Sequence, residues 1–211
     1  MDEIKPTDSL NKAAKIISFI FHPVFIPLYG LILIFFTPTV YSYIPLPVKR
    51  LLLLTVSINN IILPLILLLF LKARNHILSW EMENKRERVL PLFIATILYA
   101  ITSYIIIKIP TPAFIRTYFI GIFFISSLIT IINNWWKISI HAAALGALTA
   151  LALMLSFWMY HSIIWPLVII IIVAGLILSS RLKLNSHTPA QIWFGFLLGF
   201  IVIGSFCLGS S

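Results

Sequence analysis

Charged residues are scarce in this chain, and acidic ones are the scarcest. Of its 211 residues only 10% are charged and only 6 are Asp or Glu, whereas 61% are hydrophobic. A soluble domain of this size would need far more polar surface, so we place the chain among polytopic membrane proteins. The long apolar runs contain no acidic residue. This absence argues against a transporter or channel that couples to protons through intramembrane carboxylates.

Cysteine is almost absent as well. The only one, Cys207, lies in the last apolar run, so an internal disulfide is excluded. Lys and Arg outnumber the acidic residues, and the formal net charge is +9. The basic residues lie mostly in short connecting segments, where they set topology and contact lipid headgroups. We expect no nucleic-acid partner, because no separate soluble region could present a basic face.

Long apolar runs make up most of the chain. Each is close to the roughly 20 residues that a helix needs to cross the hydrocarbon core, and helix is the only realistic state for each crossing. We therefore predict an all-α polytopic transmembrane helix bundle with about seven spans. The number is six or seven because His22-Pro23 and Pro27 predict a kink or break in the first run. The runs cover residues 16–36, 51–71, 89–109, roughly 116–136, 142–160, 163–179 and 192–208.

The chain divides into three parts by composition. Residues 1–15 form a polar N-terminal lead-in, and residues 16–71 hold two N-terminal transmembrane helices. Residues 72–211 begin with the longest polar segment and contain the remaining spans. We expect the functional core in this third part, because it contains the polar clusters described next.

Three polar clusters adjoin the runs at intervals of two spans. The first ends at Arg88, the second contains His141, and the third contains Arg181 and His187. Two crossings return the chain to the side from which it started, so all three clusters reach the same membrane face. The sequence therefore predicts one composite site built from the three clusters.

The third cluster has the chemistry of a phosphate site. Arg181 precedes His187 by six residues, just ahead of a helix that we predict to begin near Pro189. A guanidinium clamps phosphate oxygens, and an imidazole beside it can attack phosphorus or transfer a proton. The positive end of the next helix would add to the field on the anion.

This cluster resembles the third signature of the type 2 phosphatidic acid phosphatase (PAP2) superfamily. That signature reads Ser-Arg, five residues, His, three residues, Asp. Ser180, Arg181 and His187 match it at the required spacing, and Gln191 stands in place of the final Asp.

The second cluster resembles the Pro-Ser-Gly-His signature of the same superfamily. Ser139 and His141 match, whereas Ile138 and Ile140 stand where Pro and Gly belong. A branched side chain at Ile140 replaces the residue type that lets the backbone approach a phosphate closely.

The first cluster resembles the Lys, six residues, Arg-Pro signature more loosely. Arg88 matches the Arg, and Val89 takes the place of the Pro. Glu81 falls where the Lys belongs, with Lys85 as an off-register substitute. The resemblance covers about two-thirds of the chain, from near residue 72, and implies a PAP2-like core there.

The resemblance implies metal-independent phosphoester hydrolysis without a cofactor or a metal site. His187 would be the nucleophile that forms a phosphohistidine, and His141 the general acid. Gln191 would orient the nucleophile. The implied substrates are lipid phosphates, such as phosphatidate, phosphatidylglycerol phosphate, a polyprenyl (di)phosphate or a lipid A phosphate. The residues that would hold the phosphate are Arg88, Arg181, Ser139 and Lys85.

The departures from the signatures keep a second hypothesis open. Gln191 carries no charge with which to stabilise a positive imidazole, and a comparable change in a serine-protease triad lowers the rate about 10⁴-fold. The rival hypothesis is a catalytically silent PAP2-like protein that binds lipid phosphate or serves as a membrane subunit of a complex.

Each singled-out residue also has a simpler interpretation. A histidine at an interface often caps a helix, and a basic loop often only sets topology. For Lys85 the topological interpretation is as good as the functional one, and His22 is interpreted as a polar group satisfied inside the bundle or near an interface. Of the 15 Lys and Arg residues, only four are assigned to the face opposite the clusters, namely Lys49, Arg50, Lys108 and Arg116.

This charge bias predicts that the clusters face the cytoplasm. We expect an integral protein of a bacterial cytoplasmic (inner) membrane. The resemblance implies the opposite orientation, because in many bacterial members of the superfamily the site faces outward.

Overall fold

The computed structural model describes residues 14, 16–77, 82, 85–158 and 164–209, and it contains no strand within these ranges. Seven helices in the described part are long and apolar enough to cross a membrane. The all-α bundle predicted from the sequence is confirmed. The polar lead-in at residues 1–15 falls almost wholly outside the described residues.

Prolines divide the first two spans into shorter helices. The first span, Ile16–Phe36, is helical at residues 16–20 and continues through the 3-10 turn η1 (Pro23–Phe25) into α2 (Ile26–Phe36). The 3-10 turn η2 (Val40–Tyr43) leads into the second span, Leu46–Ala73. That span comprises α3 (Leu46–Ser57), a π-helical turn η3 (Ile58–Ile62) and α4 (Leu63–Ala73). The predicted break in the first span is confirmed, and the helical segments together still match a full crossing.

The remaining five spans are single helices. They are α5 (Val89–Lys108), α6 (Ala113–Ile132), α7 (Ile140–Trp158), α8 (Ile164–Lys183) and α9 (Pro189–Leu208). Helix α7 is the most buried span, and it packs against α9, α8, α2 and α6. Close contact with α9 depends on glycine: a Cβ on Gly199 would collide with the carbonyl oxygen of Ala143, and one on Gly146 with that of Phe196.

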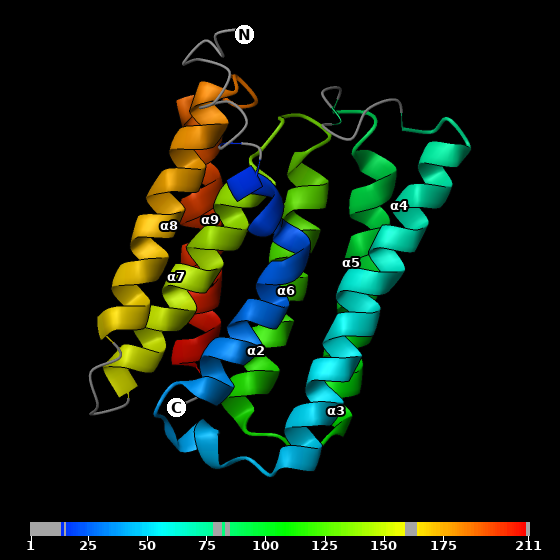
Figure 1. Ribbon diagram of the computed structural model, residues 1–211. Coiled ribbons are helices and arrows are strands. Elements are labelled where there is room, and N and C mark those ends of the chain that lie inside the picture. The colour runs from blue at the N-terminus through cyan, green and yellow to red at the C-terminus, as the bar shows by residue number, and fades with distance from the viewer. Residues whose placement is uncertain (1–13, 15, 78–81, 83–84, 159–163, 210–211) are drawn as a thin grey trace, which may run out of the picture.

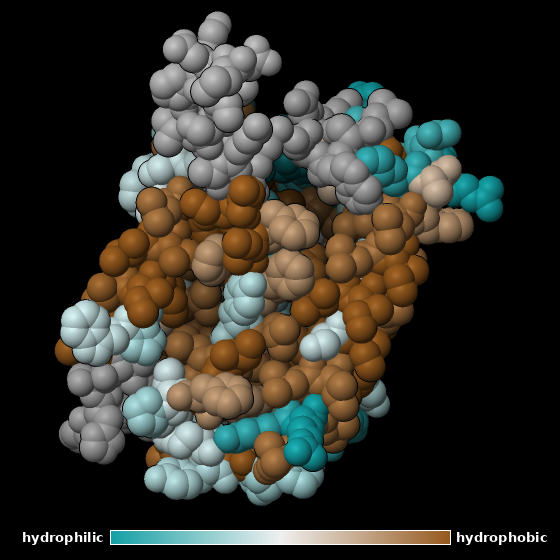
Figure 2. Space-filling model, viewed as in Figure 1, coloured by the Kyte–Doolittle hydropathy of each residue, from teal (hydrophilic) through white to brown (hydrophobic). Residues whose placement is uncertain are grey.

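The ends of the spans alternate between two sides of the bundle. The C-terminal ends of α4, α6 and α8 and the N-terminal ends of α5, α7 and α9 all lie at one end of the bundle (Figure 1). A broad apolar band covers the visible face of the molecule, with hydrophilic residues gathered toward its two ends (Figure 2). The predicted placement of the three polar clusters on one membrane face therefore agrees with the fold.

Two helix boundaries near the clusters differ from the sequence prediction. The sixth span continues to Lys183, so Arg181 lies in the last turn of α8 and not in a loop. Basic side chains are favoured in a last turn because they interact with the negative end of the helix dipole. The fifth span begins at Ile140, which places His141 in the first turn of α7.

Candidate functional site

The turn between α8 and α9 begins with a Schellman C-cap. Asn185 has a φ of +50°, in the left-handed region that Asn tolerates. Its N–H donates to the carbonyl of Leu182 at 2.9 Å, and the N–H of Ser186 donates to the carbonyl of Arg181 at 3.2 Å. These two bonds end α8 sharply and place His187 immediately after the reversal.

A capping box begins α9 directly after His187. The Thr188 hydroxyl accepts from the Gln191 N–H at 3.4 Å, and the Gln191 Oε1 accepts from the Thr188 N–H at 3.1 Å. Pro189 occupies the first helical position, where its fixed φ is favourable. The predicted helix start near Pro189 is confirmed.

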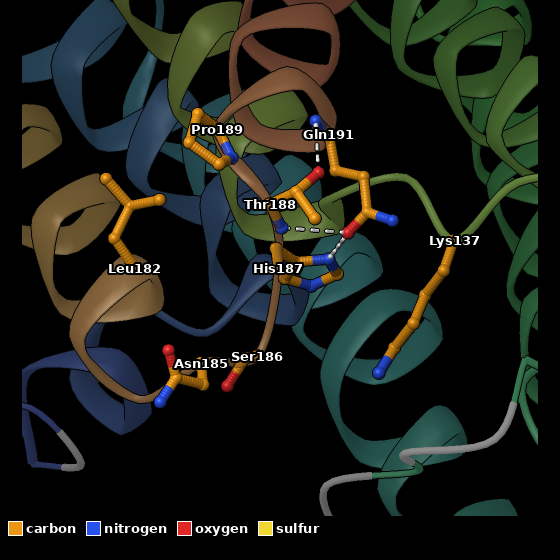
Figure 3. A pocket seen from close by; sticks show the side chains of 8 residues that line it. All are labelled: Lys137, Leu182, Asn185, Ser186, His187, Thr188, Pro189 and Gln191. Carbon is orange, nitrogen blue, oxygen red and sulfur yellow. Dashed lines mark hydrogen bonds between the residues drawn. The ribbon is translucent and has the colours of Figure 1, made fainter.

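The same Gln191 oxygen also contacts the imidazole of His187. The distance from Oε1 to Nδ1 is 3.1 Å, and Figure 3 marks this contact with a dashed line. Because a backbone N–H can only donate, its bond to this atom identifies the atom as the amide oxygen and not the nitrogen. An oxygen acceptor requires the proton of His187 on Nδ1, which leaves the lone pair on Nε2.

Burial and nearby positive charges keep this imidazole neutral. His187 is buried, and burial is the largest cause that lowers its pKa, to about 4. Arg88, Arg181 and Lys137 lower the pKa further, while the hydrogen bond to Gln191 raises it. At neutral pH the Nε2 lone pair of His187 is therefore available among three cationic side chains.

Arg88 is held at the start of α5. Its side chain is buried, and its Nε donates to the carbonyl of Met82 at 2.9 Å. Burial lowers the pKa of the guanidinium to about 10, with a further contribution from Arg181. The positive end of the helix dipole repels a cation such as Arg88. An anion bound beside Arg88 would offset this repulsion.

Lys85 connects two loops. Its ammonium donates to the carbonyls of Asn134 and Trp135 at 3.0 and 3.3 Å, and Asn133 donates to the carbonyl of Lys85 at 2.9 Å. These bonds join the segment before α5 to the start of the α6–α7 connection. The geometry gives Lys85 a structural part in shaping the cluster-bearing end.

Ser139 caps α7 and contacts α9. It is fully buried, its hydroxyl accepts from the Ala142 N–H at 3.4 Å, and its own N–H donates to the carbonyl of Gln191 at 3.3 Å. The second and third clusters are thereby joined at the level of the backbone. His141, two residues later, contacts the Ser18 carbonyl through Nε2 at 3.3 Å and interacts electrostatically with Arg181 and His187.

Two of the residues at the site were not assigned to it from the sequence. Lys137 lines the same pocket as His187 and Gln191 (Figure 3). The signal that could have identified Lys137 is its position two residues before Ser139. His22, interpreted as a polar group of the bundle, lies against His141 with ring centroids 5.4 Å apart.

A pocket lies next to His187, at the connection between α8 and α9. It has a volume of about 460 Å³. Polar and apolar groups share its wall, so it can accept a charged group next to a short apolar stretch. No cluster of three or more His, Cys, Asp or Glu suited to a metal occurs among the described residues. The residues that line the pocket are Lys137, Leu182, Asn185, Ser186, His187, Thr188, Pro189 and Gln191.

Comparison of the chain with protein-family models, with curated proteins and with solved structures gives no match. The assignment of function therefore depends on the residues and geometry of this site.

Proposed function

We propose that this protein is a PAP2-like membrane lipid phosphatase. It hydrolyses a lipid phosphomonoester or a polyprenyl diphosphate without a metal ion. The observation that supports this most strongly is the Gln191 amide oxygen, which accepts from both the Thr188 N–H and the His187 Nδ1–H. This arrangement leaves a neutral nucleophilic nitrogen beside the positive charges of Arg88 and Arg181.

The proposed reaction has two steps. In the first, the Nε2 lone pair of His187 forms a bond to phosphorus while the bond from phosphorus to the leaving oxygen breaks. His141 gives a proton to that oxygen. In the second, water attacks phosphorus and returns a proton to His141, the N–P bond breaks, and inorganic phosphate leaves with His187 neutral again.

The clamp stabilises the charge on the three phosphoryl oxygens. Arg88 and Arg181 supply two guanidinium groups, and Lys137 adds a third cation. Helices α5, α7 and α9 all begin at this end of the bundle, so their positive ends add to the field. Preplaced charges of this kind are a main source of catalysis in phosphoryl transfer.

His141 acts as the general acid through Nδ1. Its Nε2 hydrogen is directed to the Ser18 carbonyl, which can only accept. The proton that reaches the leaving group is therefore a second one, which His141 takes up from water on Nδ1 when the anionic substrate is bound. Gln191 orients His187 with a dipole and not with a full charge, so turnover is slower than with a carboxylate at this position.

The substrate is an amphiphile that remains in the leaflet. The pocket lies at the end of the spans, where headgroups are found, and Leu182 and Pro189 give it an apolar edge. The bias of Lys and Arg toward this end supports a site on the cytoplasmic side of a bacterial inner membrane as part of the proposal.

A catalytically silent, lipid-phosphate-binding protein is the second candidate, and the neutral Gln191 is the observation that favours it. The test is phosphate release by purified protein in liposomes that contain a panel of lipid phosphates and EDTA. We expect release that survives EDTA and disappears in His187→Ala. A folded wild type that binds lipid phosphate and releases none would support the silent candidate instead.

A further inference from the structure

The break in the first span lies directly against the general acid of the proposed site. The η1 turn packs against α7 and α2 continues alongside it. Two residues near the break contact His141: Ser18, within the first helical turns, through its carbonyl, and His22, at the break, through its ring. Tyr29 in α2 bonds only within the first span. These residues all lie in the first span, outside the functional core expected at residues 72–211.

The break leaves the backbone carbonyls of Ser18 and Ile20 without their usual donors within the helix. In a regular α-helix the N–H of residue 22 would donate to the carbonyl of Ser18. Here the His22 N–H donates to Phe19 at 3.2 Å instead, and Pro23 has no N–H to give. The carbonyl of Ile20 is taken by the Tyr29 hydroxyl at 2.8 Å, and the carbonyl of Ser18 by His141 Nε2 at 3.3 Å.

These contacts determine where the protons lie on both rings. A carbonyl can only accept, so His141 holds its proton on Nε2 and keeps the Nδ1 lone pair. His22 Nδ1 accepts from the Val24 N–H at 3.4 Å, so its own proton is on Nε2. The two rings meet edge to face, at an interplanar angle of 85°.

The Ser18 side chain also contacts α8. The Ser180 hydroxyl donates to the carbonyl of Ile177 at 2.7 Å, so its oxygen is left to accept from Ser18 at 3.1 Å. Both serines are buried. Ser180 directly precedes Arg181, so one residue of the first span contacts the helices of both the general acid and the phosphate clamp.

We propose that His22 and the backbone of Ser18 form a fourth part of the site, as positioning residues that hold the ring and the tautomer of His141. A role as a helix cap alone does not account for a histidine at residue 22. Capping the η1 turn requires only an acceptor, and Asn, Asp or Ser supplies one with less bulk. The imidazole adds a ring that packs against His141 and interacts electrostatically with Arg181.

The substitutions that separate the two roles are His22→Asn and His22→Ala. Asn keeps a side-chain acceptor for the Val24 N–H but removes the ring, whereas Ala removes both. Tyr29→Phe is the matched control, because it deletes the bond to Ile20 in the same break and leaves His141 untouched. The kinetic part of the test depends on the proposed phosphatase activity, so a second measurement is needed that does not.

That measurement is ¹⁵N NMR of histidine-labelled protein in lipid nanodiscs, with resonances assigned from single His→Asn variants. The wild type should show His141 protonated on Nε2 and His187 on Nδ1. In His22→Asn, loss of the ring packed against His141 should let that imidazole turn away from the Ser18 carbonyl. We therefore expect mixed tautomers at His141 and an unchanged His187. We also expect kcat to fall about 10- to 100-fold with KM within about twofold, as misplacement of a catalytic group does.

Tyr29→Phe should leave both spectra and rates close to the wild type. If His22→Asn retains the wild-type His141 spectrum, His22 is only a cap and the proposal is wrong, whether or not the protein is a phosphatase. If the spectrum changes as expected but the wild type releases no phosphate, the positioning role stands and the proposed reaction does not.

Discussion

At the scale of single residues, Gln191 has two roles, of which the sequence analysis predicted only the orienting one. It caps α9 and it orients His187, both through one oxygen. The sequence indicated a departure from the Asp of the signature, and it gave no indication that the longer amide reaches both partners. The capping role depends on side-chain geometry, which spacing alone does not define.

Gln191→Glu should raise turnover about 10-fold or more. Glutamate keeps the length and the capping box, and it adds a negative charge that stabilises the imidazole as it becomes positive. Gln191→Leu should lower turnover about 100-fold, because the Nδ1 tautomer of His187 is no longer favoured. Initial rates of phosphate release measure both changes. Equal rates for the Glu and Leu variants would show that this position does not orient a catalytic histidine.

Protonation of His187 should be visible only in acid. Its pKa of about 4 in the folded protein lies below the unfolded value of 6.5, so the unfolded chain takes up the proton first as the pH falls. The contribution of neutral His187 to stability is complete above about pH 6.5 and is lost as the pH falls through about 4. An NMR titration of the free protein should place the midpoint near 4, and a midpoint near 6.5 would contradict the buried, cation-surrounded site.

At the scale of elements, the last turn of α8 tests whether its cations bind phosphate or only set topology. Arg181 interacts with His187, whereas Lys183 is exposed on the same turn. Arg181→Gln should weaken binding of a lipid phosphate about 10- to 100-fold, and Lys183→Gln should change it less than about twofold. Binding to liposomes with and without the lipid phosphate measures both. Similar losses in the two variants would indicate general attraction to anionic lipid.

The close contact between α7 and α9 holds His141 and His187 in one site. Gly199→Ala places a Cβ against the backbone of Ala143, which cannot rotate away, so we expect a loss of about 1–3 kcal/mol in stability and a lower rate. Gly204→Ala, in the same helix, has no atom within 4 Å of the added carbon and should be neutral or slightly stabilising. Unfolding in detergent measures the stability of both variants. Equal stability of the two variants would mean that α7 and α9 are not so closely packed.

Hydrophobic run length predicted every span, because the cost of burying an unpaired backbone group in lipid leaves few alternatives to helix. The ends of the spans were less accurate. The end of α8 depends on Asn185 in a left-handed conformation, and the start of α7 on the Ser139 cap. These hydrogen bonds lie in polar segments, where the hydropathy of the sequence does not mark the end of a helix.

At the scale of the whole molecule, the order of spans predicted which clusters would meet. Alternation across the membrane brought Arg88, Arg181 and His187 to one end, and the structure agrees with that prediction. The part played by the first span could not be predicted in this way. His22 and Ser18 contact α7 and α8 through a helix break, and residues separated by more than 100 positions leave no spacing pattern.

The orientation of the bundle can be tested with single cysteines, because Cys207 is buried and out of reach of a polar reagent. Ala190→Cys marks the end that contains the site and Tyr43→Cys the other end, and both positions are exposed. A membrane-impermeant maleimide applied to intact cells should label Tyr43→Cys and not Ala190→Cys. The reverse pattern would place the site outside the cytoplasm.

The most direct test of the proposed chemistry is to trap the covalent intermediate. Protein in liposomes with a ³²P-labelled lipid phosphate is quenched in alkali within milliseconds to seconds, because phosphohistidine survives alkali and is lost in acid. We predict an acid-labile label on the peptide that contains His187, present with EDTA and absent in His187→Asn. Binding of the lipid phosphate without any label on that peptide, at any time, would contradict the assignment of His187 as the nucleophile.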